Sequence, residues 1–148
     1  VNPAPGTDHQ RKSRRLQRAL EDYFESRGAE VFNAPIDVML GVNDICQPDL
    51  VVVTDPAQIS PRGIEGAPTL LVEIASPTTR NYDRITKSRR YAERGVAHYW
   101  IVEPELGSID CYRNTESRWE SIGSFRRDQT LTHPDFPGLS IPLEAIWR

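Results

Sequence analysis

The chain has 148 residues, of which 38% are hydrophobic and 26% charged, and its formal net charge is −3 at pH 7. This length and apolar content suit one globular domain over residues 1–148 and exclude a disordered chain. No apolar stretch approaches the roughly 18 residues that a membrane span needs, and the polar start of the chain has no apolar signal-peptide core.

Apolar periodicity and the positions of proline and glycine divide the chain into helices and strands. In chain order they predict a helix over 7–27, an extended segment over 30–40, a strand over 50–53, a loop over 54–67, a strand over 70–75, a helix over 81–94, a strand over 99–102, a hairpin with strands over 108–113 and 119–122, and a tail of irregular structure or a short edge strand. A crossover helix makes the strands on its two sides parallel. The sequence therefore predicts an α/β fold with a mixed central β-sheet flanked by helices.

The charges are unevenly distributed along the chain. Residues 11–18 carry five positive charges and no negative ones, and residues 80–94 carry six positive charges against two acids. Between these basic segments, residues 19–79 hold ten acids and only two arginines. Two basic helices around an acidic middle could grip phosphates while the acids gather a cation. Charge alone favours the simpler interpretation, in which both helices present solvated faces.

Two acids stand out because their neighbours are apolar. Asp49 opens the strand predicted over 50–53, and Glu73 lies inside the strand predicted over 70–75. A carboxylate in a buried strand is unfavourable unless a cation or a partner neutralises it. Neighbouring strands would bring both acids to one sheet edge, where their oxygens could hold a divalent metal. A turn residue at Asp49 and an outward-facing position for Glu73 are the structural alternatives.

The second predicted helix carries Asp83, Lys87 and Tyr91 on one face, at positions i, i+4 and i+8. An acid four residues before a lysine is also a common helix-stabilising pair, which is the simpler explanation for Asp83 and Lys87. Lys87 gains interest only if its helix packs behind the Glu73 strand. Ser76, before Pro77, is expected to form hydrogen bonds at the strand end.

The histidines and cysteines give no further site. His9, His98 and His133 lie in unrelated contexts and show no ligand spacing. Cys46 and Cys111 have no Cys-x-x-Cys spacing, so we expect reduced thiols in a cytoplasmic protein, with a lone disulfide between them as the alternative.

The middle of the chain resembles a known family. The motifs are QPDLVVV and GAPTLLVEIASPTTRNYDRITKSRRYAERGVAHYWIVEPE, which combine a Pro-Asp strand, E-x-x-S-P-x-T, D-x3-K-x3-Y and G-V-x-x-Y-W. They resemble the Uma-type restriction endonuclease family of bacteria, which has the PD-(D/E)xK nuclease core. The resemblance covers about residues 47–105, and the first helix and Pro137-Gly138-Leu139 extend it over most of the chain.

The resemblance implies a restriction-endonuclease-like core and a metal-dependent nuclease that cleaves DNA. Asp49 and Glu73 would bind Mg²⁺ or Mn²⁺, and the backbone carbonyl of Ile74 would add a ligand. The wider nuclease pattern has a lysine two residues after the acid, where this chain has Ala75. Lys87, on the following helix, resembles a relocated catalytic lysine that would help to activate water.

Further roles are expected around this site. The supporting residues would be Asp83, Tyr91 and Ser76. The residues expected to hold the DNA backbone without reading its sequence are Arg11, Lys12, Arg14, Arg15 and Arg84. A homodimer is a further expected arrangement, and no membrane partner is expected.

Two features depart from the family pattern. Family members usually begin with a further strand that carries its own acid, which we expect this chain to lack, with Glu21 or Glu25 of the first helix as the substitute. Glu103 stands where the family usually has aspartate. These departures leave an alternative open, a catalytically inactive nuclease-like module that binds or regulates.

Overall fold

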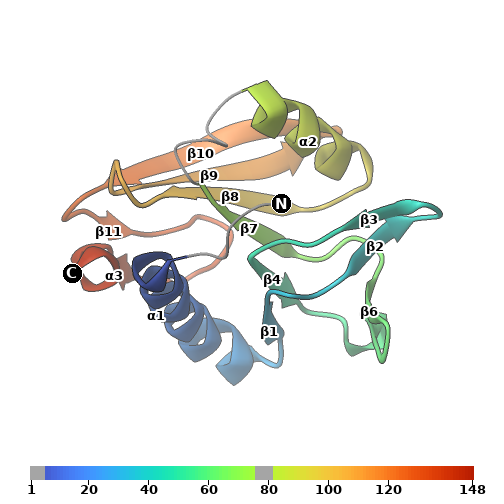
Figure 1. Cartoon of the computed structure of the whole chain (residues 1–148), viewed down its shortest axis with the longest axis horizontal. Helices are drawn as coiled ribbons and strands as arrows, with labels where there is room; N and C mark the ends of the chain where they lie inside the picture. Colours follow the sequence, from blue (N-terminus) through green and yellow to red (C-terminus); the bar gives the residue numbers. More distant parts are fainter. Residues whose placement is uncertain (1–5, 76–81) are drawn as a thin grey trace.

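The computed structural model describes residues 6–75 and 82–148, and for residues 82–86 the backbone alone. Its centre is a six-stranded mixed sheet in the order β1-β4-β7-β8-β9-β10 (Figure 1). The strands of this central sheet are β1 (Glu30–Asn33), β4 (Leu50–Val53), β7 (Leu70–Ile74), β8 (His98–Glu103), β9 (Ser108–Thr115) and β10 (Arg118–Arg126). Helices α1 (Thr7–Phe24) and α2 (Tyr82–Glu93) pack on its two faces. The predicted α/β class is confirmed.

The crossover from β7 through α2 to β8 has the predicted geometry. β7 and β8 are parallel, and the register pairs Glu73 with Ile101. β4 runs antiparallel to β7, with Leu50 opposite Val72. Every residue of β4 is buried, as expected for a strand that is covered on both faces.

The first face of the sheet is covered by α1 and by the end of the chain. Leu16, Leu20 and Phe24, spaced four residues apart, form the buried stripe of α1. The helix continues into the short helix η1 (Glu25–Arg27) and stops at Gly28, whose positive φ of 84° suits glycine. The tail adds β11 (Thr130–Leu131), β12 (Ile141–Pro142) and α3 (Glu144–Trp147) to this face. β11 and β12 pair with each other rather than extending the central sheet as an edge strand.

A second, four-stranded sheet lies with α2 on the opposite face. Its order is β3-β2-β6-β5, and the strands are β2 (Val38–Gly41), β3 (Asp44–Cys46), β5 (Ile59–Ser60) and β6 (Gly63–Glu65). The extended segment predicted over 30–40 is therefore two strands, β1 and β2, which belong to different sheets. The loop prediction over 54–67 was wrong, because this segment contains β5, β6 and the short helix η2 (Pro56–Gln58). Strands of two or three residues are too short to show periodicity.

Cys46 and Cys111 are free and buried, and they belong to the apolar clusters on opposite faces of the central sheet. Within residues 6–75 and 82–148, no helix combines the length and apolarity needed to cross a membrane.

Candidate functional site

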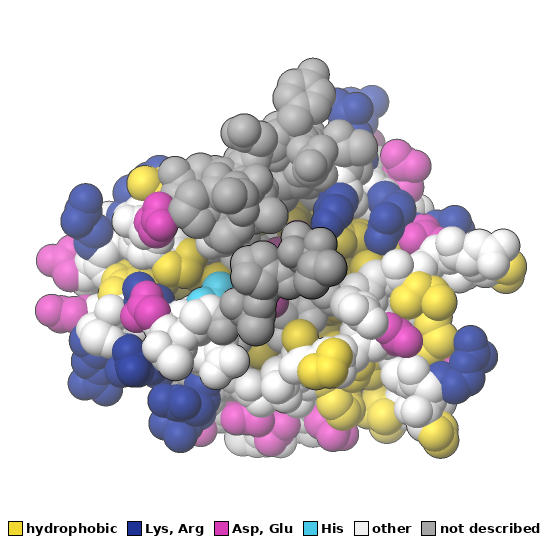
Figure 2. All heavy atoms as spheres, in the orientation of Figure 1, with side chains coloured by type: hydrophobic (Ala, Val, Ile, Leu, Met, Phe, Trp, Pro, Cys, Tyr) yellow, Lys and Arg dark blue, Asp and Glu magenta, His cyan; other side chains and the backbone are white. Residues whose placement is uncertain are grey.

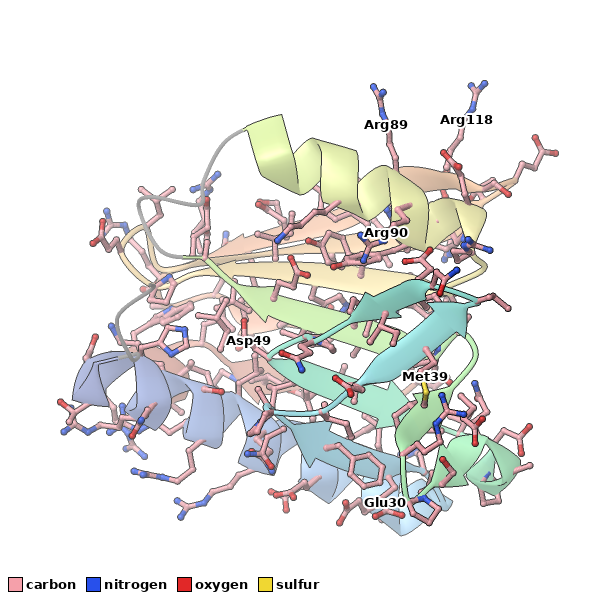
Figure 3. All side chains as sticks on the ribbon, turned by 45° about the vertical axis from the view of Figure 1, so that its right-hand side comes forward. Glu30, Met39, Asp49, Arg89, Arg90 and Arg118 are labelled. Carbon is pink, nitrogen blue, oxygen red and sulfur yellow. The ribbon has the colours of Figure 1, made fainter. Side chains whose placement is uncertain are left out.

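Asp49 lies directly before the start of β4, and Glu73 lies near the end of β7. Leu50 pairs with Val72, so the next step along each strand sets Asp49 opposite Glu73. The Ile74 N–H donates a 2.7 Å hydrogen bond to Oδ2 of Asp49, which ties this carboxylate to the neighbouring strand. Both acids are half-buried, and Figure 3 labels Asp49 near the start of β4.

Glu73 is held by two tyrosines from different elements. The hydroxyl of Tyr91, on α2, donates to Oε1 at 2.8 Å, and that of Tyr99, on β8, donates to Oε2 at 2.8 Å. Tyr91 is 3% exposed and Tyr99 is fully buried. Burial, and then the charge of Glu73, raise the pKa of Tyr91 above its usual range, so its hydroxyl stays a donor at neutral pH. The two phenols therefore fix the direction of the Glu73 carboxylate.

Tyr99 is a site residue that the sequence interpretation did not single out. Tyr99 can be recognised from its position in the sheet, because β7 and β8 are parallel and Glu73 pairs with Ile101. Tyr99 precedes Ile101 by two residues, so both side chains point to the same face as Glu73. The register of the parallel pair was needed to find it.

α2 is fastened to the sheet on both sides of Tyr91. Asp44, on β3, contacts Arg90 at 2.9 Å and accepts a 2.8 Å hydrogen bond from Arg94. The amide of Asn114, on β9, donates to two backbone carbonyls at the end of the helix. Cys46 lies in the same apolar cluster as Tyr91, and burial raises the pKa of its thiol to about 11.

The other predicted residues near α2 are exposed or lie outside the described residues. Lys87 is exposed on α2, one helical turn before Tyr91. Ser76 lies outside the described residues, as do the side chains of Asp83 and Arg84.

The basic residues of α1 lie on a helix that packs on the other face of the central sheet from Glu73. Lys12 pairs with Asp8 at 2.8 Å, and Arg11 lies 3.8 Å from the same carboxylate. Arg15 donates to the backbone carbonyls of Ile146 and Arg148, so it holds α3 against α1. Figure 2 shows dark-blue Lys and Arg side chains gathered at the lower left, over the α1 and α3 side of the molecule.

The suggestion that an acid of the first helix completes the site receives no support from the geometry. Glu25 accepts a hydrogen bond from the Val31 N–H at 3.3 Å, and Glu21 accepts one from Gln17 at 3.4 Å. Val31 pairs with Val52, so Glu25 lies toward the end of β4 that is remote from Asp49. Glu25 therefore secures the junction between α1 and β1.

The histidine prediction was wrong, because the fold brings two of them together. The rings of His98, on β8, and His133, after β11, have centroids 5.1 Å apart. Asp135 joins them, with its N–H donating to His133 Nδ1 at 3.0 Å. His98 and His133 lie 35 positions apart in the sequence, so no local spacing could reveal the cluster.

The donors around Asp49 and Glu73 fit a hard divalent cation. Carboxylate and backbone carbonyl oxygens are the ligands that Mg²⁺ and Mn²⁺ prefer. The two tyrosine hydroxyls bind the two oxygens of Glu73, and such hydrogen bonds commonly orient carboxylates that bind metals.

The mixed sheet has helices on both faces, and two acids lie at the ends of its neighbouring strands β4 and β7. This arrangement defines an α/β protein with a nuclease-like fold. A family model described as "Uma2: Putative restriction endonuclease" matches residues 1–144, and the chain belongs to this Uma2 family. It is 27% identical over 144 residues to the uncharacterized protein slr1290 of Synechocystis sp., a match that covers 95% of this chain and 75% of that relative.

The fold is also similar to a solved structure. The crystal structure of a "putative nuclease belonging to DUF820" from Anabaena variabilis matches with a TM-score of 0.74 and 20% sequence identity. The match covers 98% of this chain and 83% of that chain. The family and the nuclease-like fold expected from the sequence motifs are thereby confirmed.

Proposed function

We propose that this protein is a metal-dependent endonuclease that hydrolyses DNA phosphodiester bonds. The observation that carries the proposal is the placement of Asp49 and Glu73, which lie directly beyond the Leu50–Val72 pair at the ends of β4 and β7, with Asp49 bonded to the Ile74 N–H. Membership of the Uma2 family supports a nuclease activity. A bound Mg²⁺ or Mn²⁺ would polarise a phosphoryl oxygen and lower the pKa of an attacking water.

Some side chains would hold the cation, and others would orient the side chains that hold it. Asp49 and Glu73, with the Ile74 carbonyl, would hold the cation. Tyr91 and Tyr99 would keep Glu73 in one orientation, since each donates a 2.8 Å hydrogen bond to one of its oxygens. A carboxylate that needs no reorientation loses less entropy when it binds a metal.

Lys87 would orient the attacking water. It lies four residues before Tyr91, so the two side chains share one face of α2. Tyr91 reaches Glu73, and the exposed Lys87 ammonium would approach a substrate phosphate from the same side. Asp83 and Ser76 would support this arrangement.

The DNA backbone would be held by basic side chains from both helices. Arg11, Lys12, Arg14, Arg15 and Arg84 are the proposed contacts. Arg14 is exposed at the outer side of α1, which makes it better suited to a phosphate than Arg15, whose guanidinium holds α3. We place the enzyme in the cytoplasm, and a homodimer would offer the two strands of a duplex two such sites.

Cleavage of supercoiled plasmid tests the proposal. The parent protein should convert plasmid to nicked and linear forms with Mg²⁺ or Mn²⁺ and leave it intact in a chelator. Glu73→Gln should reduce cleavage to background, whereas Glu65→Gln, a matched change at an exposed position of β6, should cleave like the parent. Cleavage that survives Glu73→Gln would contradict the assigned site. DNA and Mn²⁺ binding without any cleavage would instead favour the inactive module.

A further inference from the structure

We propose that His98, His133 and Asp135 form a second divalent-cation site, suited to Zn²⁺, which fastens the end of the chain to the central sheet. One nitrogen from each imidazole and one carboxylate oxygen all lie within 4.8 Å of one another. His98 begins β8, whereas His133 and Asp135 belong to the segment between β11 and β12. A shared cation would therefore link two elements that the backbone joins only through a long path.

Two nitrogens of this cluster lack a protein partner. Nδ1 of His98 and Nε2 of His133 are buried and make no hydrogen bond within the described part of the chain. His98 is 8% exposed and His133 is 6% exposed. Buried polar atoms are nearly always paired with protein, water or an ion, so these two unpaired imidazole nitrogens point to missing partners.

The contacts of the two rings show which nitrogens could bind a cation. Nε2 of His98 lies 3.8 Å from Oδ2 of Asp135. His133 Nδ1 accepts the Asp135 N–H, so coordination through Nε2 moves the ring proton to Nδ1 and exchanges that hydrogen bond for a metal bond.

Two imidazoles and one carboxylate favour Zn²⁺ over Mg²⁺, which takes oxygen ligands. This donor set also separates the cluster from the carboxylate pair at Asp49 and Glu73. His98 and Leu70 are paired at the start of β8 and β7, whereas Glu73 lies near the end of β7. The two sites are on opposite faces and at opposite ends of these strands, so neither can supply ligands to the other.

Arg113 competes for Asp135, and this competition gives the proposal a specific consequence. Its guanidinium donates two hydrogen bonds to the Asp135 carboxylate, at 2.6 and 2.7 Å. A cation at the cluster would share this carboxylate with Arg113 and would be repelled by its charge. Removing the guanidinium should therefore tighten cation binding, whereas a purely structural salt bridge predicts no gain.

A Zn²⁺ titration of the chelator-treated full chain tests the site, with binding followed by competition against a chromophoric chelator. His98→Gln and His133→Gln should each weaken Zn²⁺ binding at least tenfold, Arg113→Gln should strengthen it several-fold, and His9→Gln, a matched change on α1, should have no effect. Co²⁺ bound to the parent should show visible absorption bands that Asp135→Asn weakens, which keeps the test decisive if a histidine variant does not fold.

The opposite results would overturn the site. These are Zn²⁺ binding that is unchanged in both His98→Gln and His133→Gln, binding that disappears only in Glu73→Gln, or binding that weakens in Arg113→Gln. Absence of Zn²⁺ binding to the parent at micromolar concentration would do the same. None of these outcomes depends on nuclease activity.

Discussion

Tyr99→Phe tests how much of the candidate site depends on the phenol that holds Glu73. The change removes one oxygen and keeps the ring, which packs against Tyr91 and Trp119 with centroid distances of 5.6 Å. The interaction that this change removes is a buried 2.8 Å O–H···O hydrogen bond to a carboxylate. Hydrogen bonds to charged groups contribute about 1.5–3 kcal/mol, so Tyr99→Phe should lower the free energy of unfolding by about that amount.

Urea denaturation of metal-free protein at pH 7 measures the effect, with Glu73→Gln as the second arm of a double-mutant cycle. A neutral partner makes a weaker bond, so the destabilisation caused by Tyr99→Phe should shrink to about 0.5–1.5 kcal/mol in the Glu73→Gln background. Tyr112→Phe is the matched control. Tyr112 pairs with Tyr99 across β8 and β9, and its hydroxyl makes no hydrogen bond to any described residue. Equal destabilisation in both backgrounds would refute the reasoning, and so would a Tyr99→Phe variant as stable as Tyr112→Phe.

Three further predictions concern catalysis, DNA binding and thiol chemistry. Lys87→Ala should slow DNA cleavage by about 10²–10⁴-fold without weakening Mn²⁺ binding. The control is Arg89→Ala, which should cleave normally because the Arg89 side chain points away from the sheet in Figure 3. Equal cleavage rates for the two variants would show that Lys87 is only structural. Replacing Arg11 and Arg14 by glutamate should reduce the slope of log affinity against log salt by about 0.9 for each duplex phosphate that the variant no longer neutralises, and an unchanged slope would show that these faces are merely solvated. Burial raises the pKa of the Cys46 thiol to about 11, so roughly a thousandth of it is thiolate at pH 8 and its alkylation there should be slow. The alkylation rate should rise about tenfold for each pH unit up to pH 10. Labelling at pH 8 as fast as that of an exposed thiol would contradict the burial of this side chain.

The sequence was sufficient for the part of the fold that carries the acids. The strands around Leu50–Val53 and Leu70–Ile74 are continuous apolar runs, and proline or glycine marks their ends, so both strands and the parallel crossover could be predicted. The same runs made Asp49 and Glu73 conspicuous, since acids are rare within apolar strands. Their meeting across β4 and β7 required the observed register.

The missed features all depend on contacts between distant segments. β6 is recognisable only through Ile64, which is buried and paired with Val38 in the second sheet. His98 and His133 meet because the tail folds back over β8, and Phe136 stacks on His133 with centroids 4.2 Å apart. No periodicity within either segment encodes such a meeting, because it is set by the packing of the whole tail on the α1 face.

The most direct test of the central claim is a calorimetric Mn²⁺ titration of the metal-free chain and two variants. Asp49→Asn and Glu73→Gln each remove a charge and keep one amide oxygen, which can accept the hydrogen bond from the Ile74 N–H or from one of the two tyrosines. The proposed site predicts Mn²⁺ binding to the parent that each variant weakens at least tenfold and that His98→Gln leaves unchanged. Mn²⁺ binding of equal affinity in the parent, Asp49→Asn and Glu73→Gln would contradict it.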